Sequence, residues 1–449
     1  MILWDLEWHD PFGAFAPLAG EAHAHLLHGG DQARSAEWSI ITAFPSSMII
    51  ADEESADPFR ALDDALRDRR SSAESGTRGL PFVSGAVGFA GYEAARYFEA
   101  CLDLPRSPFS FPDAVFGLYD AAALFSRSKR QAFIAGRDEA ACRRLRGALG
   151  ANSRPSSRGE TFGPLTSNFM PQQYCAAVSD VIENILDGEY YQVNLSHQLR
   201  SKALSAINAF HLFQRLAAGS DAQHGALLQY EQGAIVSNSP ERFFRIERGA
   251  YGARRIISEP IKGTRPRGEN QEEDAALARS LAADPKDRAE NIMIADLVRN
   301  DLSSICVDGT IREESICELM SLTNVHHLVS RISGVLRANE SPSSIFSALF
   351  PCGSITGAPK IAAMNAIAKM EAVGRGPYCG AIGYFDDSGV ADFSVSIRTL
   401  IVENDIIALP VGGGVTLRSD PENEYEETIA KARGARAAMG EPALEARRR

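Results

Sequence analysis

The sequence predicts an α+β fold built on antiparallel sheets. Two apolar runs on either side of Glu231-Gln232-Gly233 have the pattern of a β-hairpin. Three further runs near the C-terminus, separated by turn signals, predict an antiparallel meander. Helical periodicity from Pro171 to Leu186 and N-cap signals elsewhere place helices between the strands. Strands in hairpins, interspersed with helices, are typical of this fold class. The predicted strands are residues 226–230, 234–237, 243–246, 255–257, 380–385, 393–402 and 406–411.

The chain of 449 residues divides at one stretch that lacks periodicity. Residues 150–164 are rich in Ser, Arg, Gly and Pro, a composition typical of a surface linker. We therefore expect an N-terminal region, residues 1–160, and a longer C-terminal region, residues 165–449, in which the regular patterns concentrate.

The composition argues against several classes of protein. The net charge is −12, and an acidic chain lacks the basic surface that nucleic-acid binding requires. No apolar run approaches the ~20 residues of a membrane span, and the first residues lack the pattern of a signal peptide. The seven cysteines are dispersed and form no CxxC pair, which favours reduced thiols and a cytoplasmic location.

Two predicted helices carry carboxylates one turn apart. Asp284-Pro285 and Asp420-Pro421 each combine a good N-cap with proline at the first helical position. Residues three or four apart share a helix face. The residues on these faces are Asp287 and Glu290 in the first helix, and Glu424, Glu427 and Lys431 in the second. Carboxylates from two helices suit Mg²⁺. The alternative is two solvated faces with ordinary ion pairs.

One lysine lies where an amine can serve as a nucleophile. Lys262 sits in Pro260-Ile261-Lys262-Gly263-Thr264, between two turn-forming signals. The neutral amine is the reactive form, and a nearby cation and burial both favour it. Glu241, at the start of another strand, is a candidate general acid, because burial makes a carboxyl group hold its proton. The alternative for Glu241 is an ordinary surface charge.

Three further patterns suggest anion binding. Glycines within residues 353–357 precede a helix, so backbone N–H groups can approach an anion, although the spacing is not that of a P-loop. Arg398 ends an alternating strand that precedes Gly412-Gly413-Gly414, and a guanidinium group can grip a carboxylate. His326 and His327 are adjacent on a predicted strand, so they point in opposite directions. The alternative for residues 353–357 is a plain loop before a helix. The alternative for Arg398 is a salt bridge at the rim of the protein, and for one of the histidines it is a hydrogen-bonded residue of the core.

Taken together, and in their order along the chain, these patterns resemble the sequences of the chorismate-utilising enzyme family. The resemblance is strong over residues 165–435. It is looser in the N-terminal third, where residues 85–93 look like the segment near the amidotransferase contact of that family. The matching runs are Tyr191 to Leu195, Ser239 to Phe243, Pro260 to Thr264, Asp287 to Asn291, Asp296 to Asp301, Val325 to Val329, Ser354 to Lys360, Ile397 to Thr399, Gly412 to Gly414 and Glu424 to Thr428.

The resemblance implies an αββα sandwich in two subdomains, with antiparallel sheets inside and helices outside. It implies chorismate as the substrate and Mg²⁺ as the cofactor, held by Glu290 and Glu427 with Asp287 and Glu424 nearby. The substrate-binding residues that it implies are Gln192, His327, Thr356, Tyr384, Arg398, Gly412, Gly413, Gly414 and Lys431.

Within the family, Lys262 favours the members that make 4-amino-4-deoxychorismate, because anthranilate synthases carry alanine there. Gln192 argues against the water-using members, which place a lysine base at that position. The resemblance implies that Lys262 adds to C2 of chorismate while Glu241 protonates the departing C4 hydroxyl. Ammonia then enters at C4 and expels the lysine. The product would serve 4-aminobenzoate and folate synthesis.

The resemblance also implies a partner. We find no nucleophile motif of a glutamine amidotransferase, so we expect ammonia from a separate glutamine amidotransferase subunit or from solution. Two alternatives to this function stay open: an anthranilate synthase large component, and a non-catalytic subunit that senses chorismate or tryptophan. Residues 25–29 fall where some relatives bind tryptophan, but they match poorly.

Overall fold

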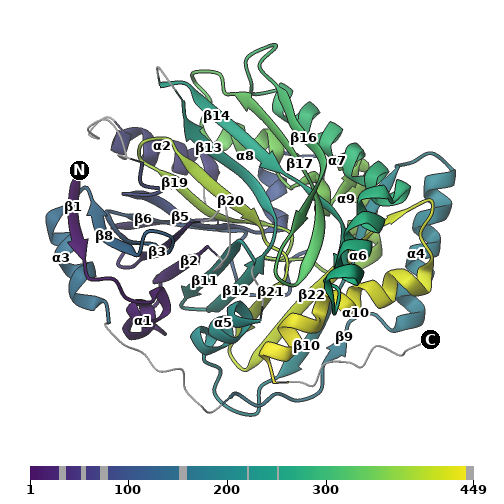
Figure 1. The fold of residues 1–449 in the computed structure, drawn as a ribbon, viewed down its shortest axis with the longest axis horizontal. Helices are drawn as coiled ribbons and strands as arrows, with labels where there is room; N and C mark the ends of the chain where they lie inside the picture. The colour runs from purple at the N-terminus through teal and green to yellow at the C-terminus, as the bar shows by residue number, and fades with distance from the viewer. Residues whose placement is uncertain are drawn as a thin grey trace.

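The computed structural model describes residues 1–29, 37–51, 57–70, 79–150, 159–219, 222–249 and 252–440. Residues 151–158 of the predicted linker lie outside the described residues. Within the described part, two large antiparallel sheets face each other and helices cover their outer faces (Figure 1). The predicted α+β sandwich is therefore confirmed.

Each sheet follows a continuous path of neighbouring strands. The first sheet has 12 strands, in the order β1 (Ile2–Leu6), β8 (Gln131–Gly136), β7 (Ala121–Ser126), β3 (Trp38–Thr42), β2 (His25–His28), β11 (His224–Tyr230), β12 (Gly233–Ser239), β21 (Thr399–Glu403), β22 (Ile406–Thr416), β10 (Gln192–Lys202) and β18 (Gly357–Ala358), with β9 (Thr166–Ser167) beside β10. The second has 10, in the order β15 (Ile261–Pro266), β17 (Val325–Val335), β14 (Arg254–Glu259), β13 (Arg242–Arg248), β20 (Ala391–Val395), β19 (Ala381–Asp386), β5 (Gly85–Ala90), β6 (Ala114–Tyr119) and β4 (Ser47–Ile50), with β16 (Arg312–Ser321) beside β17.

The helices pack on the two outer faces. Helices α3 (Glu139–Ala148), α5 (Ala209–Ala218) and α10 (Pro421–Ala438) contact the 12-stranded sheet, and α4 (Pro171–Leu186) packs against α10. Helices α2 (Pro58–Arg70), α6 (Gln271–Ala283) and α7 (Pro285–Ser303) contact the 10-stranded sheet. The remaining helical segments are α1 (Pro11–Phe15), η1 (Ala16–Leu18), η2 (Tyr92–Tyr97), α8 (Pro342–Leu349), η4 (Gly353–Ile355) and α9 (Lys360–Glu371). None of the helices in the described ranges has the length and apolar character of a membrane span.

Apolar side chains from both sheets meet in the space between them. One buried cluster joins Leu228 and Ile235 of the first sheet to Phe89 and Ile382 of the second. This packing follows from the period of two along each strand, which puts alternate side chains on the inner face.

The N-terminal region is part of both sheets. Strands β1, β2, β3, β7 and β8 belong to the 12-stranded sheet, and β4, β5 and β6 belong to the 10-stranded sheet. In particular, β2 pairs with β11, and β5 pairs with β19. The division of the sequence near residue 150 therefore does not divide the sheets.

The predicted C-terminal meander is wrong in one respect. Strands β19 and β20 form a hairpin in the 10-stranded sheet, whereas β21 and β22 form one in the other sheet. The chain crosses between the sheets at residues 396–398, where Arg398 has the left-handed φ of 53°. Arg398 therefore lies on the crossing and not at the end of an alternating strand.

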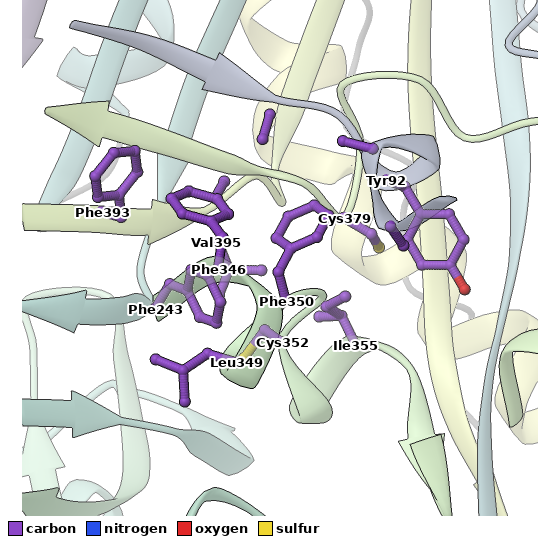
Figure 2. Packing of buried hydrophobic residues seen from close by; sticks show 14 of the residues in the cluster. Tyr92, Phe243, Phe346, Leu349, Phe350, Cys352, Ile355, Cys379, Phe393 and Val395 are labelled. Carbon is purple, nitrogen blue, oxygen red and sulfur yellow. The ribbon is translucent and has the colours of Figure 1, made fainter. Parts of the chain in front are cut away.

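An aromatic cluster supports this end of the sandwich. Figure 2 shows Phe243 of β13 and Phe393 of β20 gathered with Phe346 of α8 and Phe350, which follows that helix. The ring of Phe346 lies 5.5 Å from that of Phe350 and 5.3 Å from that of Phe393. Such pairs contribute packing energy beyond the burial of area. The cluster fixes the start of β13 and the turn at Cys352, which both lead into the site described next.

Candidate active site

A cavity of about 460 Å³ is lined by residues of both sheets. Strands β10 and β22 contribute from one sheet and β15 and β17 from the other, while α7 and α10 add charged side chains. Helix α7 contacts β15, and helix α10 contacts β22, beside which it lies in Figure 1. The predicted site residues that line the cavity are Glu241, Lys262, Asp287, Glu290, His327, Arg398, Gly412, Gly414, Glu424, Glu427 and Lys431.

Lys262 reaches the cavity from β15. Its Nζ donates a hydrogen bond of 2.9 Å to the carbonyl oxygen of Ser354, in the turn before α9. A Cβ atom built on Gly414 would lie 3.3 Å from Lys262 Nζ and 2.4 Å from Gln192 Nε2. The lysine and the buried Gln192 amide therefore lie directly over Gly414, and the absence of a side chain at Gly414 makes room for both.

Glu241 is almost fully buried at the start of β13, beside the lysine. Burial raises the pKa of Glu241 from 4.5 to about 7, against the opposing effects of Ser354 and Lys262. The Oε1 atom of Glu241 has no hydrogen-bond partner among the described residues. At neutral pH this carboxyl group is therefore protonated in a large fraction of molecules, which is the state that a general acid requires.

The acidic helices form as their caps predict. Asp284 accepts hydrogen bonds from the N–H groups of Lys286 and Asp287, and Asp420 accepts one from Asn423. Because these caps fix where each helix begins, they also fix which side chains reach the cavity. Glu290 follows on α7, one turn after Asp287.

The carboxylates from the two helices meet around a lysine. Lys286 Nζ lies 3.9 Å from Glu290 Oε1 and 3.8 Å from Glu424 Oε1. Burial raises the pKa of both carboxyl groups. The neighbouring Glu424 and Asp287 add to the rise at Glu290, and Glu427 adds to the rise at Glu424. Glu290 Oε1 is buried and has no hydrogen-bond partner among the residues that the structure describes. Asp287 pairs instead with Arg265, at 3.0 Å.

A second cationic group lies on the α10 side of the cavity. Lys431 Nζ forms an ion pair of 2.8 Å with Glu427 and donates a hydrogen bond of 2.9 Å to the Gly412 carbonyl. Burial favours the neutral form of Glu427, yet Lys431 and two further lysines hold its pKa below the ordinary value. Arg398 donates a hydrogen bond of 3.0 Å to the Lys431 carbonyl oxygen. The cavity thus has cationic groups suited to an anionic ligand.

The two adjacent histidines point in opposite directions, as predicted. His327 lines the cavity and shares a hydrogen bond of 2.9 Å with the Thr264 hydroxyl. Burial lowers the pKa of His327 to about 4, so its ring is neutral at physiological pH. His326 contacts Asp274 and Ser321 instead, outside the cavity.

Four predicted substrate-binding residues are not among those that line the cavity. The Thr356 hydroxyl donates to the Cys352 carbonyl within the preceding turn. Gln192 and Gly413 lie beside the lining residues, with Gly413 close to Glu424. Tyr384 needs a correction: it lies with Phe82 in an apolar cluster and lines a different, smaller cavity. The reason is the order of strands in the 10-stranded sheet, in which four strands separate β19 from β15, the strand that carries Lys262.

Sequence reasoning missed several residues that do line the cavity. These residues are Asn194, Arg265, Lys286, Ser354 and Tyr378. Tyr378 lies in the loop before β19, where no periodic pattern indicates an orientation. Lys286 reads from the sequence as an ordinary solvated lysine of a helix, and only the meeting of α7 with α10 brings it between two glutamates.

The carboxylates at the cavity could hold a divalent cation if oxygen atoms of a bound ligand completed its coordination. No three acidic, histidine or cysteine side chains in the described residues come together as a metal site. Mg²⁺, however, is commonly held by one or two carboxylates, with water and substrate oxygens completing the shell. Glu290 offers a buried oxygen that has no hydrogen-bond partner in the described residues, and the ammonium of Lys286 lies between Glu290 and Glu424, where positive charge is favourable.

A buried acid, a lysine and a mixed set of charges in one cavity define an enzyme that acts on a small anionic substrate. The sequence profile of the chorismate binding enzyme family matches residues 24–437. The chain belongs to this family, and it is an enzyme that acts on chorismate.

Individual relatives fall into two groups. The chain is 35% identical over 434 residues to aminodeoxychorismate synthase component 1 of Escherichia coli (strain K12), covering 93% of each chain. It is 32% identical over 456 residues to anthranilate synthase component 1 of Thermus thermophilus, covering 96% of this chain and 95% of the relative. Among solved structures, anthranilate synthase component I from Streptococcus pneumoniae TIGR4 has a TM-score of 0.77 at 25% identity, covering 91% of this chain and 93% of that one. The menaquinone-specific isochorismate synthase of Escherichia coli shares the fold, with a TM-score of 0.75 at 17% identity, covering 98% and 94%.

Proposed function

We propose that this enzyme aminates chorismate at C4 and releases 4-amino-4-deoxychorismate. The observation that carries the proposal is the position of Lys262, whose amine lies in the cavity next to Glu241, a carboxyl group whose pKa burial raises to about 7. A nucleophile and an acid in one cavity permit substitution on chorismate through a covalent adduct. An enzyme that relied on direct attack by ammonia would have no need of this lysine.

The chain's own residues can carry each proton and bond change. The neutral Lys262 amine adds to C2 of the ring, both ring double bonds shift by one position, and the C4 hydroxyl leaves as water with the proton of Glu241. Ammonia then forms a bond to C4, the two double bonds shift back, and the C2–N bond to Lys262 breaks. The new ammonium group at C4 gives a proton to the Glu241 carboxylate, which restores the acid. The sum is chorismate plus ammonia giving the amino product plus water. General acid catalysis of this kind typically contributes about 10²–10⁴-fold in rate.

Binding of the substrate's two carboxylates follows from the charges around the cavity. We assign Arg398 and Lys431, with the backbone beside Gly412 and Gly414, to one carboxylate. We assign Glu290 and Glu427 to a Mg²⁺ ion, with Asp287 and Glu424 one turn earlier on the same helices. When bound, the ion would neutralise the other carboxylate of chorismate.

The proposed reaction needs a source of ammonia. Relatives named component 1 support a partner component. We propose that this partner is a separate glutamine amidotransferase subunit, that the pair acts in the cytoplasm, and that the product serves 4-aminobenzoate and folate synthesis. All seven cysteines are free thiols, which agrees with a reducing compartment.

The test is to incubate the protein with chorismate, Mg²⁺ and ammonium and to identify the product by mass. We expect 4-amino-4-deoxychorismate from the natural chain. Lys262→Ala should lose the covalent adduct seen by intact-protein mass spectrometry and nearly all turnover, while the exposed Lys202→Ala serves as the control. Full ammonia-dependent activity in Lys262→Ala would remove the lysine from the mechanism.

Anthranilate synthesis is the second candidate, because an anthranilate synthase component matches 96% of this chain. The same assay separates the two. Anthranilate is fluorescent and has lost the enolpyruvyl group, whereas 4-amino-4-deoxychorismate retains it. A product with the mass of anthranilate would therefore replace the first proposal with the second.

A further inference from the structure

Asn194 borders the cavity together with Lys262 and Gly414. It lies on β10, two residues after Gln192 and directly opposite Gly414 on β22. Because side chains alternate along a strand, Asn194 and Gln192 share the face that turns toward Lys262. The Asn194 side chain is almost fully buried, and its Nδ2 atom has no hydrogen-bond partner among the described residues.

The backbone of Asn194 is held in place from two sides. Its N–H group donates a hydrogen bond of 2.8 Å to the Thr356 carbonyl, and its own carbonyl accepts one of 2.6 Å from Arg375 Nη2. Arg375 is itself buried and forms an ion pair of 2.6 Å with Glu371. The amide of Asn194 is therefore carried on a rigid support, although nothing in the described structure satisfies its donor.

A buried amide without a partner destabilises a protein, and most buried amides avoid this state. The carboxamide of Gln229 shows the usual arrangement, since its Nε2 donates to three backbone carbonyls and its Oε1 accepts from Gly20. Of the buried side-chain atoms without a hydrogen-bond partner in the described residues, some lie elsewhere, such as Gln214 Oε1, but five lie near the cavity. These five are Gln192 Nε2 and Oε1, Asn194 Nδ2, Glu241 Oε1 and Glu290 Oε1. A bound ligand would satisfy such a group.

We propose that the side-chain amide of Asn194 donates a hydrogen bond to an oxygen atom of the bound substrate, at the end of the cavity next to Lys262. The inference deepens the proposed function, because it takes chorismate as the ligand. Asn194 thereby orients the ring so that the carbon to be attacked faces the lysine. The rigid support keeps this donor in place before the substrate arrives, which limits the entropy lost on binding.

Two substitutions at Asn194 and one control test the proposal. Asn194→Leu removes the polar group at similar size, and Asn194→Asp keeps acceptor oxygens but removes the donor. We expect both to lower kcat/KM for chorismate by about 10- to 100-fold. Asn194→Leu should also unfold at an unchanged or higher temperature, because it replaces an unsatisfied amide. Gln229→Leu, the same kind of change at a satisfied amide, should unfold at a lower temperature while its folded fraction keeps the natural kcat/KM.

The outcomes separate the possibilities. A lower unfolding temperature for Asn194→Leu, similar to that of Gln229→Leu, would mean that the amide is structural and would overturn the inference. Full activity in Asn194→Asp would exclude the donor role. If the natural chain itself makes no 4-amino-4-deoxychorismate but binds chorismate, the proposed function fails separately. The affinity of the Asn194 variants for chorismate, measured by calorimetry with Mg²⁺ present, then still decides the inference.

Discussion

Replacing Glu241 with glutamine is expected to stabilise the folded chain at alkaline pH and to lower its activity. Glutamine has nearly the shape of a protonated glutamate and never becomes charged. The natural side chain must ionise in a buried site as the pH rises, and glutamine avoids that cost. The same proton is the one that the proposed reaction delivers to the leaving hydroxyl.

The magnitude follows from the pKa of Glu241, which burial raises from 4.5 to about 7. A raised pKa means that the folded state binds this proton more tightly than the unfolded state does. Below the unfolded pKa both states are protonated, and glutamine gives no advantage. As the pH rises from the unfolded pKa of 4.5 to the folded pKa of about 7, the natural chain loses stability relative to Glu241→Gln, and above the folded pKa the difference levels off. The difference reaches about 1 kcal/mol near pH 5 and about 3 kcal/mol near pH 8.

Urea unfolding of both proteins at these two values of pH measures the difference. Burial also raises the pKa of Glu93 to about 7, so the stability of each protein alone contains a second contribution. Glu93 is present in both proteins, and the subtraction removes its effect. In the same samples, kcat with ammonium should fall by about 10²-fold or more in the variant.

Two results would refute the reasoning. A stability difference that stays constant between the two values of pH would show that Glu241 does not hold its proton in the folded state. A variant with natural kcat would show that the proton of Glu241 is not needed for the departure of the hydroxyl group.

Two further predictions concern the neighbours of these groups. Gly414→Ala would place a Cβ atom 2.4 Å from Gln192 Nε2 and 3.3 Å from Lys262 Nζ, so we expect kcat/KM for chorismate to fall by about 10-fold or more. The control is Gly434→Ala, where the added Cβ would have no atom within 4 Å. This control should keep full activity and unfold at a slightly higher temperature, because alanine favours the helix. Equal activity of the two variants in a steady-state assay would contradict the crowding argument. Glu290→Gln should raise the Mg²⁺ concentration for half-maximal turnover by about 10-fold or more. An unchanged Mg²⁺ titration would remove Glu290 from the metal site.

Local signals predicted the helical part of the site well. The caps at Asp284 and Asp420 depend on residues within one turn, so the sequence alone places Glu290 and Glu427 on defined helix faces. Hairpins such as β11 with β12 are equally local, because a short turn joins strands that pair with each other.

The other parts of the site could not be predicted from the sequence, because they depend on pairing between strands that are far apart in the chain. The side of a strand on which Tyr384 lies can be read from alternation, but its distance from Lys262 depends on the order of strands in the sheet, in which four strands separate β19 from β15. The crossing between sheets at Arg398 has no glycine to mark its left-handed φ. Cavity residues that the sequence did not reveal, such as Asn194, Lys286 and Tyr378, come together only when both sheets and two helices are assembled.

The interleaving of the N-terminal strands with the rest of the sheets has a consequence for solubility. Without β2 and β5, strands β11 and β19 would each present a row of unpaired backbone N–H and C=O groups. Both strands are almost wholly buried and rich in apolar residues, and they have no lysine to discourage pairing with another molecule. Exposed edges of this kind promote aggregation. The N-terminal third therefore pairs with two strand edges that would otherwise be exposed. A fragment that contains every proposed catalytic residue but lacks β2 and β5 would self-associate.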